Sequence, residues 1–534
     1  MTVSTQLFIG GRIYSSFAPD ATSIAVTDGT VVWVGDERAG RALHPDAVVI
    51  DLEGGFVTPA FVDTHVHVTS LGLALIGLNL ADTTSLEHCL DLVQDYAAAH
   101  PDAIIWGHGW DESRWPVAQP PTTDDLDRVA PGRRVYLARI DVHSAAASSA
   151  LRIDVPSLIG ADGYDAQGPL RTDAHHLVRA AARSLVDASQ RARARAAALD
   201  SFAAQGIVAV HECGGPEIGG LDDFRELLGC EHPVEVRGYW GQAVKDDVAA
   251  RAVLAETGAV ALGGDLFVDG ALGSHTALLH EPYTDAPHTC GASYLDVDEI
   301  ADHVIACTQV GVQAGFHAIG DAAMTALAQG FARAAEELGS PAIAARGHRI
   351  EHAEMMTRDQ AKFFASCGVI ASMQPGFDAQ WGAPGELYEQ RLGADRAQTL
   401  NNFAALAAAG VSLAFGSDTP VTAVSPWAMV SAAVHHHTEG SGISPRAAFA
   451  AATRGAWRAG GVRDGMAGTL TPGAPASYAI WDTGELVVSA PKDSVQRWST
   501  DPRSRVPALP QLDPASTWPV LRQSVHRGVV VYER

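Results

Sequence analysis

Lysine is nearly absent from this chain. Lys245, Lys362 and Lys492 are its three lysines among 37 basic residues, and all the other basic residues are arginines. Positive charge as a whole is scarce, because 62 acidic residues give the chain a formal net charge of −25. A nucleic-acid-binding surface depends on clustered positive charge, so this balance argues against a nucleic acid as the partner. The excess of acidic residues is better explained by solubility.

Cysteine is also scarce. The six cysteines are scattered and form no Cys-x-x-Cys pair, which argues against a disulfide scaffold and against a zinc ribbon. The N-terminus shows no basic segment followed by a long apolar core, and the run Leu71–Leu80 is about half the length that crosses a bilayer. We therefore expect a cytoplasmic protein in a reducing compartment, without membrane contact.

Apolar residues, in contrast, are plentiful: 47% of the 534 residues are hydrophobic, enough for a large domain and a smaller one. In the central region, short apolar runs alternate with alanine-rich segments of helical length, which favours a parallel sheet. Eight such runs predict an α/β fold of the (β/α)8 TIM-like barrel type, with a doubly wound open sheet as the alternative. The expected strands are Phe61–Thr64, Ile207–Val210, Val234–Tyr239, Leu266–Val268, Val312–Phe316, His348–Glu351, Val369–Met373 and Val411–Phe415.

Two further features define the expected domains. Residues 68–206 separate the first two strands. A whole βαβ unit takes only about 30 residues, so we expect this longer connection to contain an insertion subdomain over the barrel mouth. Short strand-like segments with turn signals at both chain ends predict a small β-sandwich domain formed by both termini. The expected boundaries are 1–58 with 468–534 for this domain and 59–467 for the barrel.

The most informative motif is His65-Val66-His67, which follows the first expected barrel strand. Residues two apart on a strand point to the same side, so both imidazoles would leave one face about 7 Å apart at the backbone. This geometry suits two ligands of one metal ion.

Three more candidate ligands stand at other strand ends, where barrels of this kind build their active sites. His317 ends the fifth expected strand, His352 the sixth and Asp418 the eighth. Any one of them alone is more often a satisfied structural residue. Four histidines and one aspartate, each at a strand end, predict a metal centre.

These motifs are similar to those of the amidohydrolase superfamily, and the chain resembles its amidohydrolase 3 family, which includes N-substituted formamide deformylases. The resemblance extends nearly end to end, through Gly11–Tyr14, Trp106–Asp111, Asp269–Ser274 and Gly468–Gly473. It implies hydrolysis of a C–N bond, other than a peptide bond, in a small amide, formamide or cyclic amide. A homodimer is compatible with it.

The resemblance also implies roles for the strand-end residues. His65 and His67 would hold one metal ion with Asp418, while His317 and His352 would hold a second ion or complete a mononuclear site. Imidazole and carboxylate ligands suit Zn²⁺, which lowers the pKa of a bound water to about 7. Asp418 would be the general base, and the metal or a histidine such as His352 would polarise the carbonyl oxygen.

One position departs from the family. Many relatives carry a carboxylated lysine that bridges two metal ions, where this chain has Asp265. An aspartate is shorter by roughly 5 Å, so it would bridge only if the backbone moves inward or a water intervenes. The centre is therefore expected to be mononuclear, or bridged by another residue such as Cys213 or Glu212, or catalytically silent. Cys213 is otherwise expected to be a buried, inert thiol.

Candidate substrate-binding residues lie in the insertion and after the fourth expected strand; they are Trp110, Asp111, Asp269 and His275. The leading hypothesis is a metal-dependent hydrolase of a small-molecule amide. The alternatives are a deaminase of a heterocyclic amine with a mononuclear site and a non-catalytic barrel scaffold.

Overall fold

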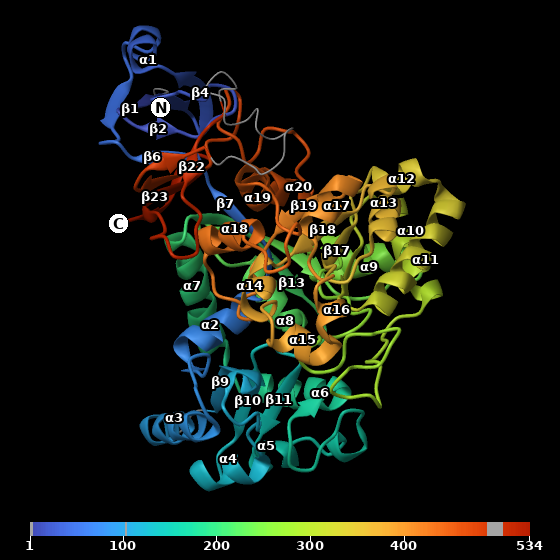
Figure 1. The fold of residues 1–534 in the computed structure, drawn as a ribbon. Helices are drawn as coiled ribbons and strands as arrows, with labels where there is room; N and C mark the ends of the chain where they lie inside the picture. Colours follow the sequence, from blue (N-terminus) through green and yellow to red (C-terminus); the bar gives the residue numbers. More distant parts are fainter. Residues whose placement is uncertain (1–3, 102–103, 489–505) are drawn as a thin grey trace.

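The computed structural model describes residues 4–101, 104–488 and 506–534 (Figure 1). Its central unit consists of eight strands in two parallel four-stranded sheets, ordered β15-β14-β13-β7 and β16-β17-β18-β19. The strands are β7 (Phe61–Val66), β13 (Ile207–Gly214), β14 (Glu235–Trp240), β15 (Ala261–Leu262), β16 (Gly315–Ala318), β17 (Arg349–His352), β18 (Ile370–Met373) and β19 (Ser412–Phe415).

Single parallel bridges join the two sheets at both edges. Leu262 pairs with Ala314 on one side, and Val66 pairs with Thr419 on the other. Strands and helices alternate along the chain, as the sequence predicts, and the mixed α/β architecture is consistent with a TIM-barrel-type fold. The helices after β13 are α8 (Leu221–Leu228), α9 (Asp247–Thr257), α10 (Val297–Val310), α11 (Asp321–Leu338), α12 (Ser340–Ala344), α13 (Arg358–Ser366), α14 (Pro375–Trp381), α15 (Leu387–Leu392), α16 (Ala394–Ala397), α17 (Phe403–Ala409), α18 (Pro426–Val434), α19 (Pro445–Ala450) and α20 (Ala456–Ala459).

The fourth strand differs from its predicted position. The regular ladder of this strand lies earlier, at β15, and the chain leaves it through Gly263-Gly264. The expected segment Leu266–Val268 keeps one parallel bridge, from Phe267 to His317, and is otherwise irregular. Gly264 has φ 75°, and a Cβ there would lie 2.9 Å from the Cys213 sulfur. A Cβ on Gly263 would lie 2.3 Å from the Gly315 backbone. The pair therefore needs glycine, and it lets the chain approach its neighbours closely just before Asp265.

The chain ends form two sheets. One has the order β4-β3-β1-β5; the other, β2-β6-β20-β23-β24, combines two N-terminal strands with three C-terminal ones. Arg527 and Gly528 adopt positive φ, so the chain turns there and forms the β23–β24 hairpin. The elements are β1 (Thr5–Ile9), β2 (Arg12–Ile13), β3 (Ser23–Thr27), β4 (Thr30–Gly35), α1 (Glu37–Leu43), β5 (Val48–Asp51), β6 (Phe56–Pro59), β20 (Tyr478–Asp482), β23 (Val520–His526) and β24 (Val529–Glu533), with a separate pair β21 (Leu486–Val487) and β22 (Leu509–Pro510).

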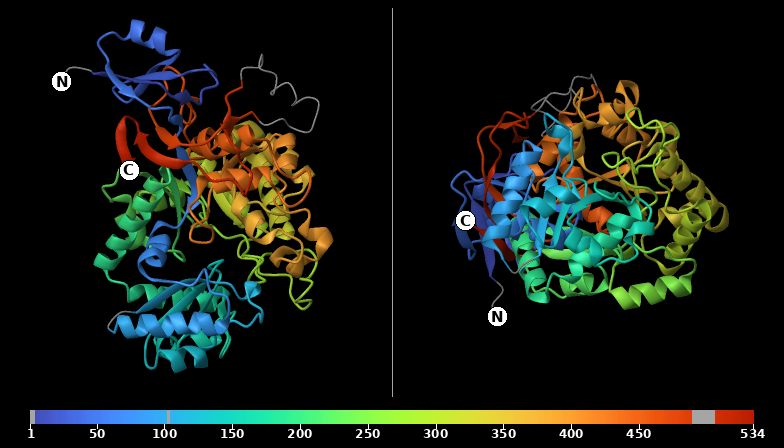
Figure 2. Two further views of the ribbon diagram at one scale, coloured as in Figure 1. Left: turned by 60° about the vertical axis from the view of Figure 1, so that its left-hand side comes forward. Right: turned by 90° about the horizontal axis from the view of Figure 1, so that it is seen from below.

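The long segment between β7 and β13 carries its own five-stranded sheet, ordered β12-β11-β10-β9-β8. It and the terminal sheets lie at opposite ends of the central strands (Figures 1 and 2). No helix in the described part of the chain is both long and apolar enough to cross a membrane. The elements of the segment are α2 (Val68–Ile76), β8 (Leu78–Asn79), α3 (Leu86–Ala99), β9 (Ile105–Trp110), α4 (Thr123–Val129), β10 (Val135–Arg139), β11 (Ser144–Ala147), α5 (Ser149–Ile153), β12 (Leu170–Arg171), α6 (Thr172–Ser184) and α7 (Ala188–Ala204).

Candidate metal centre

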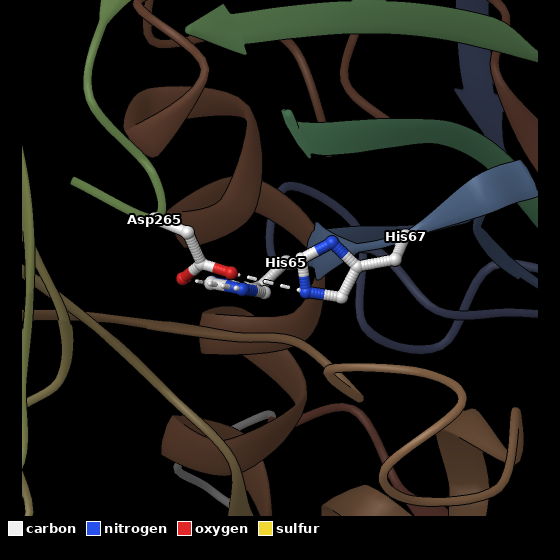
Figure 3. A group of neighbouring side chains, drawn as sticks. All are labelled: His65, His67 and Asp265. Atoms are coloured by element: carbon white, nitrogen blue, oxygen red, sulfur yellow. Dashed lines mark ion pairs between the residues drawn. The ribbon is translucent and has the colours of Figure 1, made fainter. Parts of the chain in front are cut away.

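The five predicted ligands meet at the ends of four strands, around the carboxylate of Asp265. Asp265 Oδ2 lies 3.1 Å from His67 Nε2, and Asp265 Oδ1 lies 3.3 Å from His65 Nε2 (Figure 3). The same Oδ1 is 3.4 Å from His317 Nδ1 and 3.9 Å from His352 Nε2. Asp265 thus contacts histidines from three different strands. The preceding Gly263-Gly264 segment packs closely against Gly315 and Cys213, which brings Asp265 near the ends of β16 and β13.

Asp418 supplies a second carboxylate to the same place. Its Oδ1 lies 3.3 Å from His67 Nε2 and 3.5 Å from His65 Nε2. Asp418 and His352 both adopt left-handed backbone conformations, with φ 54° and 68°. Such strain in residues other than glycine is kept where the surroundings fix it, and it is frequent at functional sites.

The donor set fits a divalent cation. His65 Nε2 and Asp418 Oδ1 are buried and have no hydrogen-bond partner among the described residues, and they face each other across the centre. Buried polar atoms are normally satisfied, so this pair indicates a missing partner for both. Imidazole nitrogens and carboxylate oxygens together are the ligands that zinc and related divalent ions accept.

The electrostatics of the centre also favour a bound cation. Burial alone would raise the pKa of Asp265, but the histidines around it, His65 first among them, outweigh burial and hold that pKa well below its usual range. Burial would lower the pKa of His67, yet the neighbouring carboxylates of Asp265 and Asp418 raise it to about 9. The two carboxylates are therefore ionised and attract positive charge into the centre.

Asp265 is shared by two potential ligand sets. One consists of His65, His67 and Asp265, and another of Asp265, His317 and His352; within each set the ligand atoms lie within 4.8 Å of one another. A third set joins His65 and His352 with Asp418. Asp265 accordingly lies between two pairs of histidines, where a carboxylate that bridges two ions would lie.

The other two candidate bridging residues have partners other than Asp265 among the described residues. Cys213 groups with His65 and Glu351, and burial raises the pKa of its thiol to about 12, so the thiol is neutral. Glu212 Oε2 accepts a hydrogen bond from Val68 N at 2.7 Å, at the start of α2. Among the described residues, neither forms a ligand set with Asp265 or Asp418.

Glu351 is a functional candidate that was not among the predicted site residues. Its Oε2 accepts a hydrogen bond from His65 Nδ1 at 3.0 Å, which directs His65 Nε2 toward the centre. Arg349 donates to both oxygens of Glu351 at 2.9 Å, and its guanidinium lies 4.3 Å from the centroid of the Tyr239 ring. A sequence signal exists, since Arg349 and Glu351 are charged residues two positions apart in a short buried strand that ends at the predicted ligand His352.

Glu351→Gln tests this orienting contact. The amide has one oxygen and no charge, so it holds His65 less firmly, and we expect the affinity for metal to fall by about 10–100-fold. Competition with a zinc-binding dye measures that affinity. Glu212→Gln is the matched control, because it makes the same change at a buried carboxylate that contacts α2 instead of a histidine. An equal loss of affinity in both variants would contradict the role of Glu351.

Two adjoining cavities open onto the centre. One cavity lies between the centre and the insertion, and a second lies toward α14 and α15. The residues that line both are Asp141, His143, His317, His352 and Asp418.

The four predicted substrate-binding residues line neither cavity. Trp110 is packed in the insertion, where its Nε1 donates to Leu137 O at 2.9 Å, and Asp111 pairs with Arg139 at 3.0 Å. Asp269 accepts hydrogen bonds from three backbone N–H groups, including that of Gly320 at 2.8 Å. His275 pairs with Asp285 at 3.1 Å. These motif residues support loops and strands next to the site.

Comparison with known proteins agrees with this geometry. The chain is 27% identical to Protein LONG AFTER FAR-RED 3 of Arabidopsis thaliana, covering 91% of this chain and 90% of that protein. It is 23% identical to the N-substituted formamide deformylase of Arthrobacter pascens, covering 81% and 83%. A solved structure of an uncharacterized metal-dependent hydrolase from Pyrococcus furiosus is 27% identical, with a TM-score of 0.68 and coverage of 89% and 98%.

The match to a family covers most of the chain. Residues 48–532, which include every candidate ligand, match the amidohydrolase family. The family membership that the motifs predict is thereby confirmed, and this chain belongs to the amidohydrolase family.

Proposed function

We propose that this chain is a hydrolase that cleaves the C–N bond of a small amide, formamide or cyclic amide at a centre of two divalent metal ions. One observation carries the proposal: the Asp265 carboxylate lies between the His65–His67 pair and the His317–His352 pair. The related deformylase acts on N-substituted formamides, as its name states, which supports this choice of substrate class.

The residues have separable roles. His65, His67 and Asp418 would hold one ion, His317 and His352 the other, and Asp265 both. A bound ion such as Zn²⁺ would supply an acidified water and polarise the carbonyl group. Asp418 would act as the general base toward the attacking water and as the general acid toward the nitrogen of the leaving amine. His352 is held by Gln374 Oε1, which accepts from its Nδ1 at 2.8 Å, so that its Nε2 faces the reaction centre.

Further expectations belong to the same proposal. The bridges at both edges of the two sheets support closure into a (β/α)8 barrel. The mixed five-stranded sheet supports a composite domain from residues 1–58 and 468–534. The scarcity of cysteine supports a reducing, cytoplasmic location.

Metal removal tests the proposal. We expect the full chain, purified without a histidine tag, to contain about two zinc ions by plasma mass spectrometry and to hydrolyse members of a panel of formamides, cyclic amides and N-acyl amines. Exhaustive chelation should abolish this activity and added zinc should restore it, because the ion supplies the acidified water. Activity that survives chelation would refute a metal-dependent reaction. About one zinc per chain would mean that Asp265 does not bridge.

A further inference from the structure

One face of helix α6 presents positive charge to the cavity above the centre. His176, Arg179 and Arg183 are spaced by three and four residues, which places them on one side of the helix. All three line the cavity between the centre and the insertion, which is also lined by His67 and Asp418. The helix belongs to the insertion, so the insertion contributes a charged wall opposite the candidate ligands.

The two arginines have no carboxylate partner in the described part of the chain. Arg179 is only 6% exposed; it donates to the carbonyl oxygen of Glu217, and its Nε has no partner at all. Arg183 is half-buried and forms no ion pair or hydrogen bond with the described residues. The nearby carboxylate of Asp223 is already bound to Arg195 at 2.7 Å.

Burying a charge without a partner costs free energy, and burial accordingly shifts the pKa values of side chains on this helix. Burial, together with the neighbouring Arg179, lowers the pKa of Arg183 to about 10. Burial also lowers the pKa of His176 to about 3, so that side chain is neutral at pH 7. The positive charge of the wall therefore comes from the two arginines, and an anion brought by a ligand would stabilise it.

The adjoining cavity, which lies toward α14 and α15, has a mainly apolar lining. It is lined by apolar side chains that include Phe377, Trp381 and Leu387, while His352 and Asp418 line both cavities. A ligand that extends across the centre would thus place one end among the arginines and the other among aromatic and aliphatic groups.

We propose that the substrate is an amide with a carboxylate on one side of its C–N bond and an apolar group on the other, and that Arg179 and Arg183 bind the carboxylate. Arginine donates paired N–H groups that match a carboxylate, which makes it the residue of choice for this contact. The inference rests on the proposed function and narrows its substrate class.

Inert probes test the site independently of turnover. Isothermal titration of the metal-loaded full chain would compare 3-phenylpropionate with the neutral 3-phenyl-1-propanol and with propionate, none of which contains an amide. We expect 3-phenylpropionate to bind about 10–100-fold more tightly than the alcohol, as charge-assisted hydrogen bonds imply. It should also bind more tightly than propionate, which lacks the apolar group.

Substitutions then locate the contact. Arg183→Met should remove the advantage of the acid over the alcohol without changing the alcohol's affinity, and Arg183→Lys should retain part of it. Arg193→Met is the matched control, since Arg193 is exposed on α7, and it should change nothing. Equal binding of acid and alcohol, or an equal loss for both in Arg183→Met, would overturn the inference. A phosphonate analogue that binds more tightly than the carboxylate would overturn the choice of carboxylate.

The two proposals fail in different ways. If the chain hydrolyses amides but binds acid and alcohol alike, the carboxylate site is refuted and the function stands. If the acid is preferred through Arg183 but the metal-loaded chain hydrolyses no amide in the panel, the function is refuted and the anion site stands.

Discussion

Asp265→Asn is expected to lower the metal content from about two ions per chain to one or none. It should also lower kcat by at least about a hundredfold, which is more than the loss of a residue that only orients a metal ligand usually costs. The carboxylate contacts nitrogens of four histidines, so its loss removes the negative charge that two cations would share. An amide of the same shape keeps the packing and removes the charge. Plasma mass spectrometry and steady-state kinetics on the same preparation measure both effects.

Asp269→Asn is the matched control for this change. Asp269 is also buried and lies four residues further along, but it contacts backbone N–H groups and no histidine. We expect it to alter thermal stability and to leave metal content unchanged. If Asp265→Asn retains both its metal and its activity, Asp265 merely accepts hydrogen bonds from the histidines, and the centre is held by the other five residues.

Asp418→Asn is expected to lower kcat by about 10²–10⁴-fold, the contribution of a general acid–base group, and to change KM little. The effect should arise mainly from proton transfer, because His65, His67 and Asp265 still surround the first ion position. Metal content measured beside kcat separates the two roles of Asp418. Metal loss in proportion to the activity would mean that Asp418 acts only as a ligand.

The meeting of the candidate ligands can be predicted from the sequence because they follow the C-terminal ends of parallel strands. Residues at the C-terminal ends of parallel strands meet at one edge of the sheet, so His65, His317, His352 and Asp418 could be brought together without knowledge of any helix. The parallel pairing of β7 with β13 and of β16 with β17 places them there. The order of the strands along the chain is enough for this inference.

Side-chain direction could not be predicted in the same way. Side-chain length alone makes Asp265 too short to bridge, and only the backbone path through Gly263-Gly264 brings it within reach. Trp110 lies in a conspicuous motif, yet its indole faces the interior of the insertion. Arg179 and Arg183 lie in no motif, and they reach the cavity because α6 packs above the strand ends. These outcomes depend on tertiary packing, which spacing along the chain does not contain.

If Asp265 bridges two ions as proposed, the close packing of Gly263-Gly264 changes what this centre needs in order to assemble. A lysine at a bridging position becomes a ligand only after its amine has captured carbon dioxide, a reversible step that ties metal loading to dissolved bicarbonate. With Asp265 brought into reach by two glycines, the acid is present as soon as the chain has been translated. Assembly would then require only folding and a supply of metal, and it would proceed equally in air-equilibrated and carbon-dioxide-free solution.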